Sequence, residues 1–263
     1  MLCNSYAEEI RRHLIPRRRD ITVLALDETD STNDDARELA EKGYPEGTLV
    51  VARRQRRGRG RMGRRWMSPE GGVFMSIILR PPRSLPGLSA LPLVVGYGVA
   101  RALREEHGVP AAIKWPNDVL VRQKKIAGIL CESAFEQTDC WVVAGIGINA
   151  TMTGQDFPRE IQDLATSLLL ETEIPVSIPA LVASVYDWVM QSYSAFLSRG
   201  FASLLPGILQ IAAYVGENVI VSTPTGPVGG KMLGIDQDGL LLLELDNKEE
   251  RRIPAGDVSL RKG

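Results

Sequence analysis

The sequence has few of the residues on which metal sites and disulfide frameworks depend. Its 263 residues include only three cysteines and two histidines, His13 and His107. The cysteines, Cys3, Cys131 and Cys140, are odd in number and none belongs to a C-x-x-C pair. A structural zinc site and a disulfide framework are therefore both disfavoured. Cysteine usage of this kind is typical of a reduced, cytosolic protein.

Long apolar runs are also missing from the sequence. No stretch approaches the roughly 18 consecutive apolar residues that a transmembrane helix needs. The N-terminus has no apolar segment followed by a small-residue cleavage site, so we predict neither a membrane partner nor a signal peptide. An apolar content of 44% and a charged content of 24% are ordinary for a globular protein. The predicted location is cytoplasmic.

Charge is distributed unevenly along the chain. The net charge is −1, from 31 basic and 32 acidic residues, yet eight of the thirteen residues from Arg53 to Arg65 are arginine. Without these eight, 23 basic residues would stand against 32 acidic ones. The arginines are thus a local basic feature on an acidic body. A general nucleic-acid binder usually spreads its basic charge over a face or a whole domain.

Three chemistries fit this arginine-rich stretch, in which Gly58, Gly60 and Gly63 separate the arginines. Arginine presents a planar fork of donors that matches phosphate and carboxylate oxygens. Glycine permits close approach of the backbone to a ligand. The stretch is therefore a nucleic-acid patch, a nucleotide or acyl-phosphate site, or a solvated basic loop, which is the common outcome for a charge run. Composition alone leaves the three open.

Hydrophobic periodicity predicts an α+β body over most of the chain. One helix is expected after Asp30 or Ser31, either of which could cap it, and a second one ends at Gly108. Gly145 and Gly147 lie within a predicted strand, which indicates close approach of a ligand or of another backbone. The expected strands are 21–26, 48–52, 72–79, 111–114, 119–121, 126–132 and 141–149, and the later helices are 92–107 and 178–197.

From about residue 215 the pattern changes to short strands separated by turn residues. Asp238-Gly239 is a strong hairpin signal, and this part is expected to form a small β-barrel. Residues 1–20 contain one short amphipathic segment and are too short for a helix-turn-helix DNA-binding domain, which needs about three helices. We therefore expect an N-terminal extension at 1–20, a main domain at 21–213 and a barrel domain at 214–263.

Five motifs are distinctive in their order and spacing: Asp30-Ser31-Thr32-Asn33, Gly58-Arg59-Gly60-Arg61-Met62-Gly63-Arg64-Arg65-Trp66, Lys114-Trp115-Pro116-Asn117-Asp118, Lys125-Ile126-Ala127-Gly128-Ile129-Leu130 and Gly145-Ile146-Gly147-Ile148-Asn149. Together they make the chain resemble the biotin protein ligases, that is, the biotin–[acetyl-CoA-carboxylase] ligases. The resemblance runs from about residue 21 to the end, where Gly256 to Arg261 looks like part of the family's C-terminal domain. It implies a central mixed β-sheet flanked by helices, as in class II aminoacyl-tRNA synthetases, with a small SH3-like barrel.

The resemblance implies a two-step reaction without a prosthetic group. Biotin and ATP with Mg²⁺ give biotinyl-5′-AMP and pyrophosphate. The ε-amine of a lysine on a biotin carboxyl carrier protein then attacks the mixed anhydride and releases AMP. Many biotin ligases carry an N-terminal winged-helix DNA-binding domain, but residues 1–20 are too short to form one, so we predict a monofunctional ligase without it. The resemblance also implies that Mg²⁺ arrives with ATP and that no protein-only metal site is needed. An edge-to-edge homodimer of the central sheet is common in this family.

The resemblance also implies roles for individual side chains. The first step brings a carboxylate onto the α-phosphate, so cations must bridge the two anions. Lys125 is the leading candidate, and its alternative is an exposed hairpin lysine. Asp118 is expected to orient or deprotonate the acceptor amine or to assist Mg²⁺, and its alternative is a turn cap. The expected catalytic residues are Lys125, Arg61 and Asp118.

The binding residues that the resemblance implies fall into two overlapping groups. Trp66 is expected to stack on adenine, with core packing as its alternative, whereas Ser31, Thr32 and Asn33 could instead serve only as helix caps. Arg56 and Arg57 depart from the family pattern, in which small or uncharged residues are common. The expected biotin-binding residues are Ser31, Thr32, Asn33, Gln55, Gly58, Arg59, Gly60, Arg61, Lys125, Gly128 and Gly145, and those for ATP and the adenylate are Arg59, Arg61, Arg64, Trp66, Asn117, Lys125 and Asn149.

Two other functions remain open at this level. A lipoate or octanoate protein ligase shares the fold, but the Gly-Arg-Gly-Arg loop and Lys-Trp-Pro-Asn-Asp favour biotin. A nucleic-acid-binding protein that uses the Arg/Gly loop would show an affinity that falls steeply with salt. That alternative leaves the segments 114–118 and 125–130 unexplained.

Overall fold

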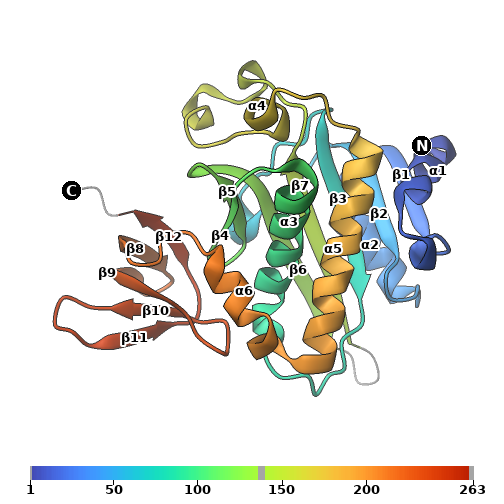
Figure 1. Cartoon of the computed structure of the whole chain (residues 1–263). Coiled ribbons are helices and arrows are strands. Elements are labelled where there is room, and N and C mark those ends of the chain that lie inside the picture. The colour runs from blue at the N-terminus through green and yellow to red at the C-terminus, as the bar shows by residue number, and fades with distance from the viewer. Residues whose placement is uncertain (1, 136–139, 261–263) are drawn as a thin grey trace.

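The computed structural model describes residues 2–135 and 140–260. They form a seven-stranded sheet with helices on both faces and a separate five-stranded sheet near the C-terminus (Figure 1). The predicted α+β fold with a mixed central sheet is confirmed: β1 and β2 are parallel and the other neighbours are antiparallel, in the order β1-β2-β3-β7-β6-β5-β4. The strands are β1 Val23–Thr29, β2 Leu49–Gln55, β3 Gly72–Leu79, β4 Ala111–Lys114, β5 Asp118–Val121, β6 Lys124–Phe135 and β7 Cys140–Asn149.

The helices divide between the two faces of the central sheet. The helices α3 (Leu91–His107) and α5 (Ile178–Arg199) pack together over one face, and α2 (Thr32–Glu41) covers part of the other (Figure 1). Within the described ranges, no helix is long and apolar enough to cross a membrane. The remaining helices are short: α1 Asn4–His13, α4 Leu168–Thr172 and α6 Leu205–Gln210.

The α2 face of the sheet carries large side chains under α2 and small ones at the start of that helix. In β3 and β7, Ile78 and Val143 pack against α2. Ser76 and Gly145 lie two positions away along these strands and point to the same face, since side chains alternate along a strand. These small residues leave the sheet open at the start of α2, which is where a ligand could lie flat against it.

The N-terminal segment is packed onto the main domain. Residues Tyr6 and Ile10 of α1 are 2% and 0% exposed and belong to the main core. The Cys3 amide donates to the carbonyl of Ala25 at 2.8 Å, and Arg18 forms a 2.9 Å ion pair with Asp187 of α5. The segment 1–20, which we expected to be an extension, therefore contributes to the core and packs along β1 at the edge of the sheet.

The first strand is longer than its apolar residues indicate. We expected a strand at 21–26, whereas β1 runs from Val23 to Thr29. Glu28 pairs with Arg54 and Thr29 with Gln55 in the parallel ladder with β2. Pairing of backbone groups, which does not need apolar side chains, carries β1 and β2 up to the arginine-rich loop.

The C-terminal sheet is antiparallel, with the order β11-β10-β9-β8-β12. Its end strands β11 and β12 do not pair with each other in the described residues, so hydrogen bonding gives an open sheet and not a closed barrel. The predicted hairpin joins β9 to β10, with Gly239 at φ +81, and the carbonyl of Gly239 accepts a 3.0 Å hydrogen bond from buried Trp115. Arg261 lies outside the described residues. The strands are β8 Asn218–Thr223, β9 Gly226–Ile235, β10 Leu241–Glu244, β11 Glu250–Ile253 and β12 Asp257–Leu260.

Candidate active site

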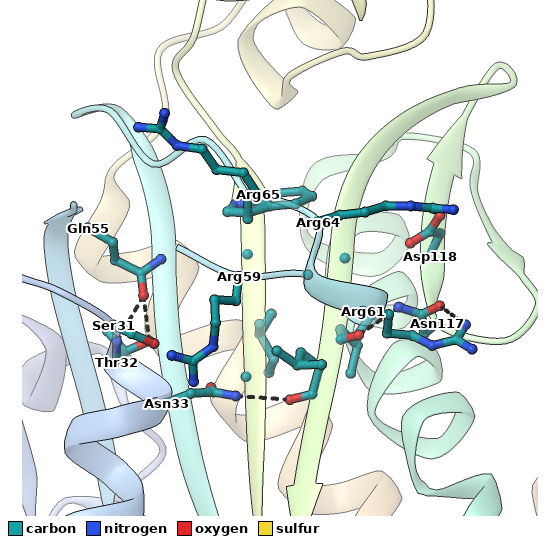
Figure 2. Close-up of a pocket in the computed structure, with 18 of the residues that line it drawn as sticks. Ser31, Thr32, Asn33, Gln55, Arg59, Arg61, Arg64, Arg65, Asn117 and Asp118 are labelled. Carbon is teal, nitrogen blue, oxygen red and sulfur yellow. Dashed lines mark hydrogen bonds between the residues drawn. The ribbon is translucent and has the colours of Figure 1, made fainter. Parts of the chain in front are cut away.

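A pocket lies on the α2 face of the central sheet, between the start of α2 and the arginine-rich loop (Figure 2). Its wall is built from segments that are far apart in the sequence: all five motifs contribute to it, together with Gln55 and Asp257. The lining residues are Ser31, Thr32, Asn33, Gln55, Arg59, Gly60, Arg61, Arg64, Arg65, Trp66, Asn117, Asp118, Lys125, Gly128, Ile129, Leu130, Gly145, Ile146, Gly147 and Asp257.

The N-terminus of α2 forms one end of the pocket. The first amides of a helix have no partner within the helix, and the Thr32 amide donates instead to Oε1 of Gln55 at 2.9 Å. The Thr32 hydroxyl donates to the same oxygen at 3.1 Å, and Nε2 of Gln55 donates to Ser68 at 2.9 Å. Ser31 is the N-cap residue but accepts no capping hydrogen bond with its side chain. Helix capping alone therefore does not account for the short polar side chains of this motif.

Ser76 lies beneath this end of the pocket and was not predicted. Its hydroxyl is 0% exposed and lies 2.8 Å from Oγ1 of Thr32 and 2.7 Å from Oδ1 of Asn33. A buried hydroxyl needs such partners because burying it without one is costly. The only signal for it in the sequence is a single polar residue inside the apolar strand 72–79.

A carboxylate and two ammonium groups meet on the opposite side of the pocket. Nζ of Lys125 lies 2.6 Å from Oδ1 of Asp118, and Nζ of Lys114 lies 3.7 Å from Oδ2. The side chain of Asp118 is only 16% exposed. Lys125 is thus held at the pocket wall by a strand-borne carboxylate, and Lys114, which we did not predict, shares that carboxylate.

The C-terminal sheet contributes a residue that sequence reasoning missed. Nη1 of Arg61 donates to Oδ1 of Asn117 at 2.9 Å and to Oδ1 of Asp257 at 3.3 Å. Arg64 forms a 2.7 Å ion pair with the other carboxylate oxygen of Asp257. Asp257 is the first residue of β12, and it connects the loop to the second sheet. Its position in the closing motif Gly256 to Arg261 was the one available signal.

The side chains of Arg59 and Arg61 point in different directions. Figure 2 shows the side chain of Arg59 running from the loop toward Asn33, and its guanidinium forms two hydrogen bonds with Asp34, at 2.6 and 2.8 Å. These hydrogen bonds hold the pKa of Asp34 below its ordinary value and raise that of Arg59. Asp34 is on the first turn of α2 and was not predicted.

Glycines make room for the side chains over the sheet. A Cβ on Gly147 would lie 2.5 Å from Nε1 of Trp66, and one on Gly145 would lie 2.1 Å from Oδ1 of Asn33. Trp66 therefore lies against the strand backbone, with Nζ of Lys125 5.2 Å from its ring centre. Its Nε1 is buried against β7 and has no hydrogen-bond partner among the described residues.

Two of the predicted binding residues do not line the pocket. Gly58 is buried behind it, where a Cβ would meet Ser68 and the carbonyl of Trp66 at 2.5 Å. Nδ2 of Asn149 donates to the carbonyl of Thr166 at 2.9 Å. Its amide therefore supports the segment that runs beside Lys125. Besides Asp257, the lining residues that we did not predict are Arg65, Ile129, Leu130, Ile146 and Gly147.

The other arginines of the loop are distributed over its outer side and its base. Arg53 stacks over the ring of Tyr6, 4.4 Å from its centre. Arg56 donates to Asp30 at 2.6 Å, whereas the side chain of Arg57 is 80% exposed. Protein carboxylates thus neutralise much of the charge that would otherwise repel within the loop.

Two parts of the chain match the profiles of known protein families. Residues 25–149 match the sequence profile of the Biotin/lipoate A/B protein ligase family, and residues 214–261 match the biotin protein ligase C-terminal domain. The bifunctional ligase/repressor BirA of Bacillus subtilis is 39% identical over 240 residues, which cover 90% of this chain and 74% of BirA. The biotin–[acetyl-CoA-carboxylase] ligase of Paracoccus denitrificans is 34% identical, and the match covers 89% of this chain and 98% of that protein.

Solved structures give the same relationship. The biotin protein ligase of Aquifex aeolicus, in complex with biotin and ATP, superposes with a TM-score of 0.81 and is 33% identical. That match covers 92% of this chain and 99% of the Aquifex chain. The similarity therefore includes both the central sheet and the C-terminal sheet.

Proposed function

The chain belongs to the biotin protein ligases, and on that premise we propose how its pocket carries out their reaction. It is an ATP-dependent ligase that activates biotin and transfers it to a carboxylase. The observation that supports this assignment most directly is the pocket itself. Neutral polar groups at the start of α2 lie at one end, and Arg61, Arg64 and Lys125 lie at the other.

The biotin ring fits the α2 end of the pocket. A ureido group has one carbonyl acceptor and two N–H donors, and it is uncharged. Ser31 offers a hydroxyl that is not used for capping, and Gln55 and Thr32 are held by each other and by Ser68 and Ser76. Gly145 keeps the floor beside Asn33 low enough for a flat bicyclic ring.

The phosphate end is cationic. When the biotin carboxylate attacks the α-phosphate, negative charge moves onto pyrophosphate, and fixed cations lower the energy of that change. We assign this role to Arg61 and Lys125, because Asn117 and Asp118 already orient them. Trp66 offers a ring face for adenine. The contribution of Asn149 is indirect, through the segment beside Lys125.

Asp118 suits the second step. Transfer needs the acceptor lysine in its neutral form, and a carboxylate beside the reacting carbon can orient the amine and take up its proton. In the first step the same carboxylate holds Lys125 at 2.6 Å. This second role requires the acceptor amine to approach from the mouth of the pocket.

We expect Mg²⁺ to enter with ATP. Mg²⁺ prefers oxygen ligands and commonly binds substrate phosphates plus one or two carboxylates, and Asp118 and Asp257 are the carboxylates that line the pocket. Within the described residues, no three His, Cys, Asp or Glu side chains gather closely enough to hold a metal ion. When bound, Mg²⁺ would neutralise charge on the phosphates.

The proposed partners are biotin, ATP and the biotin carboxyl carrier protein of a carboxylase in the cytoplasm. An edge-to-edge homodimer and the absence of a nucleic-acid partner remain predictions. The first is tested by sedimentation with and without biotin and ATP, and the second by a gel shift, in which tight sequence-specific binding would contradict it.

Mass spectrometry of a carrier domain provides the direct test of the function. The carrier is incubated with the enzyme, biotin, ATP and Mg²⁺, and it should gain the mass of one biotinyl group on its acceptor lysine. Lipoate in place of biotin is the matched control. Modification by lipoate and none by biotin would favour the related lipoate ligases instead.

A further inference from the structure

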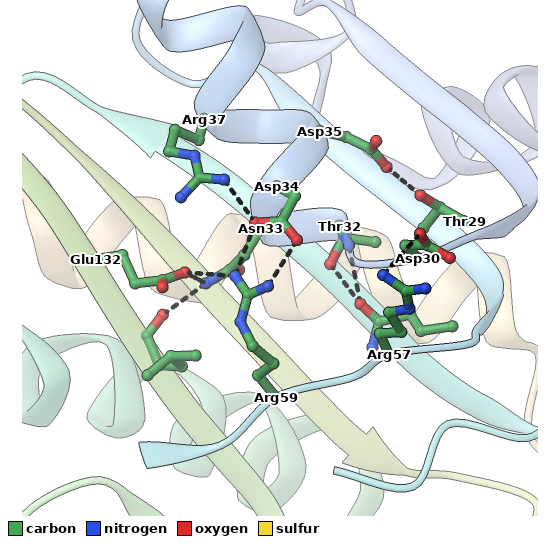
Figure 3. Close-up of polar contacts among 12 residues, drawn as sticks. Thr29, Asp30, Thr32, Asn33, Asp34, Asp35, Arg37, Arg57, Arg59 and Glu132 are labelled. Carbon is green, nitrogen blue, oxygen red and sulfur yellow. Dashed lines mark hydrogen bonds and ion pairs between the residues drawn. The ribbon is translucent and has the colours of Figure 1, made fainter. Parts of the chain in front are cut away.

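The guanidinium of Arg59 is fully directed toward protein carboxylates (Figure 3). Nη1 lies 2.6 Å from Oδ2 of Asp34, and Nη2 lies 2.8 Å from its Oδ1. Nη2 is also 3.5 Å from Oε2 of Glu132 on β6. A forked pair of hydrogen bonds to one carboxylate fixes orientation as well as distance. Arg59 therefore ties the loop to two other elements of the pocket wall.

Glu132 makes a second contact that leads back to the ring end of the pocket. Its Oε2 accepts a 2.6 Å hydrogen bond from Nδ2 of Asn33. Oδ1 of Asn33 in turn lies 2.7 Å from the hydroxyl of Ser76. Asn33 is 6% exposed, and its Oδ1 occupies space that a Cβ on Gly145 would fill. One carboxylate thus fixes both Asn33 and Arg59.

Three consecutive residues in the first turn of α2 form hydrogen bonds with other segments around the pocket. Thr32 holds Gln55, Asn33 holds Glu132, and Asp34 holds Arg59. Asp34 is well placed to remain ionised, because negative charge is stabilised at a helix N-terminus. Arg37, one turn along the helix, donates to Asp34 at 2.9 Å but forms no hydrogen bond or ion pair with the loop in the described part of the chain, and this provides a matched control.

An anion that approached Arg59 in this arrangement would also approach Asp34 and Glu132. Like charges at short range repel, so this corner of the pocket is unfavourable for a carboxylate or phosphate unless Arg59 first leaves its partners. Arg61 and Lys125 each pair with one carboxylate that a second cation shares, Arg64 at Asp257 and Lys114 at Asp118. Arg59 instead pairs with two carboxylates, so the charge distribution separates it from the two cations assigned to the reacting anions.

We propose that Asp34 and Glu132 are positioning residues, which act through Arg59 to hold the loop backbone at Gly58 to Gly60 against α2 and so close the biotin end of the pocket. This inference rests on the proposed function. The guanidinium of Arg59 fixes the conformation of the loop, whereas Arg61 and Lys125 interact with the phosphates. Loss of the clasp formed by Asp34, Arg59 and Glu132 weakens biotin binding and leaves the chemical step nearly unchanged.

The test compares Asp34→Ala, Arg59→Ala and the double variant, using calorimetry with biotin alone and adenylate formation at saturating biotin. Each single variant should weaken biotin binding about tenfold, the size expected when a charged hydrogen bond is lost. The double variant should bind biotin no more weakly than Arg59→Ala does, since Arg59→Ala already removes the Asp34–Arg59 interaction. The rate at saturating biotin should stay within about twofold of the parent. Arg37→Ala should bind biotin as the parent does.

The second arm uses Glu132→Gln, which can still accept from Asn33 but loses its charge toward Arg59. It should weaken biotin binding less than Asp34→Ala does. Thermal unfolding checks that each variant is folded; Asp34→Asn replaces Asp34→Ala, and Arg59→Gln replaces Arg59→Ala, where the alanine variant is not. A slow adenylation rate in Arg59→Ala combined with a normal rate in Asp34→Ala would overturn the proposal, because it would place Arg59 on the phosphates. Failure of the parent protein to bind biotin would instead refute the proposed function.

Discussion

At the scale of single residues, the arginine loop separates into side chains with different tasks. Arg53 packs on Tyr6, Arg59 binds Asp34, and Arg61 and Arg64 bind Asp257. Composition could show only that the stretch was cationic. Which carboxylate each arginine meets depends on contacts across 25 to 196 residues of sequence, and no local pattern encodes them.

The cation assignment leads to a prediction about rate. Lys125→Ala and Arg61→Ala should each slow formation of biotinyl-AMP by about 100-fold or more, since each removes a charge needed as pyrophosphate departs. Pyrophosphate release measures the rate, and thermal unfolding should change little because both side chains are partly exposed. Lys124→Ala is the matched control and should keep the parental rate. Parental rates in either active-site variant would refute the roles assigned to these cations.

The Asp34–Arg59 pair leads to a prediction about pH. The pKa of Asp34 is lowered in the folded protein, chiefly by its hydrogen bond from Arg59. The pair therefore stabilises the fold above the unfolded pKa of about 3.9, and this contribution is lost as the pH falls through the lower folded pKa. Urea unfolding of the parent and Asp34→Asn should differ at pH 7 and converge in acid. A difference that stayed constant with pH would show that Asp34 acts by packing.

At the scale of elements, the strands were predicted well where apolar residues define them. The strand at 72–79 has the predicted limits, and the helix predicted at 92–107 begins one residue earlier. The ends of β1 and β6 were missed, because backbone pairing continues through polar residues such as Asp27 and Glu28. Glycines within strands were a useful signal, and two of them, Gly145 and Gly147, lie in the pocket floor.

The strand glycines can be tested by adding one methyl group. In Gly147→Ala the added Cβ would lie 2.5 Å from Nε1 of Trp66. This distance is too short for a van der Waals contact, so the indole must move away from the sheet. The KM for ATP should rise about tenfold, a loss of roughly 1.4 kcal/mol. Gly154→Ala is the control, since nothing lies within 4 Å of its added Cβ. An unchanged KM in Gly147→Ala would indicate that Trp66 does not contact the nucleotide.

At the scale of the whole molecule, the pocket is completed by both sheets. Fourteen predicted site residues line it, because the family motifs recur in each wall of the central domain. Asp257 could not be assigned from the residues around it. Its role arises only when the C-terminal sheet docks, through contacts such as Trp115 to Gly239. The predicted division at 213 and 214 therefore runs through a shared core and close to a shared site.

Substitution of Asp257 tests whether the C-terminal sheet contributes to ATP binding in the pocket of the central sheet. Asp257→Ala should release Arg61 and Arg64 and raise the KM for ATP several-fold, while biotin binding at the α2 end stays close to parental. Initial-rate kinetics and calorimetry measure the two quantities. Glu250→Ala, an exposed acidic residue of β11, is the control for loss of charge. Equal weakening of biotin and ATP would point to general disorder of the loop.

The position of Trp66 should make its intrinsic fluorescence sensitive to nucleotide binding. The structure describes all four tryptophans, and Trp66 alone among them lines the pocket. Trp115 and Trp141 are buried in cores, and Trp188 lies on the helical face next to Arg101. Indole emission depends on polarity, nearby charge and hydrogen bonding of its N–H, and Trp66 has an ammonium at 5.2 Å and a free N–H. Arrival of the nucleotide should therefore be visible as a change in emission, in real time and without a label.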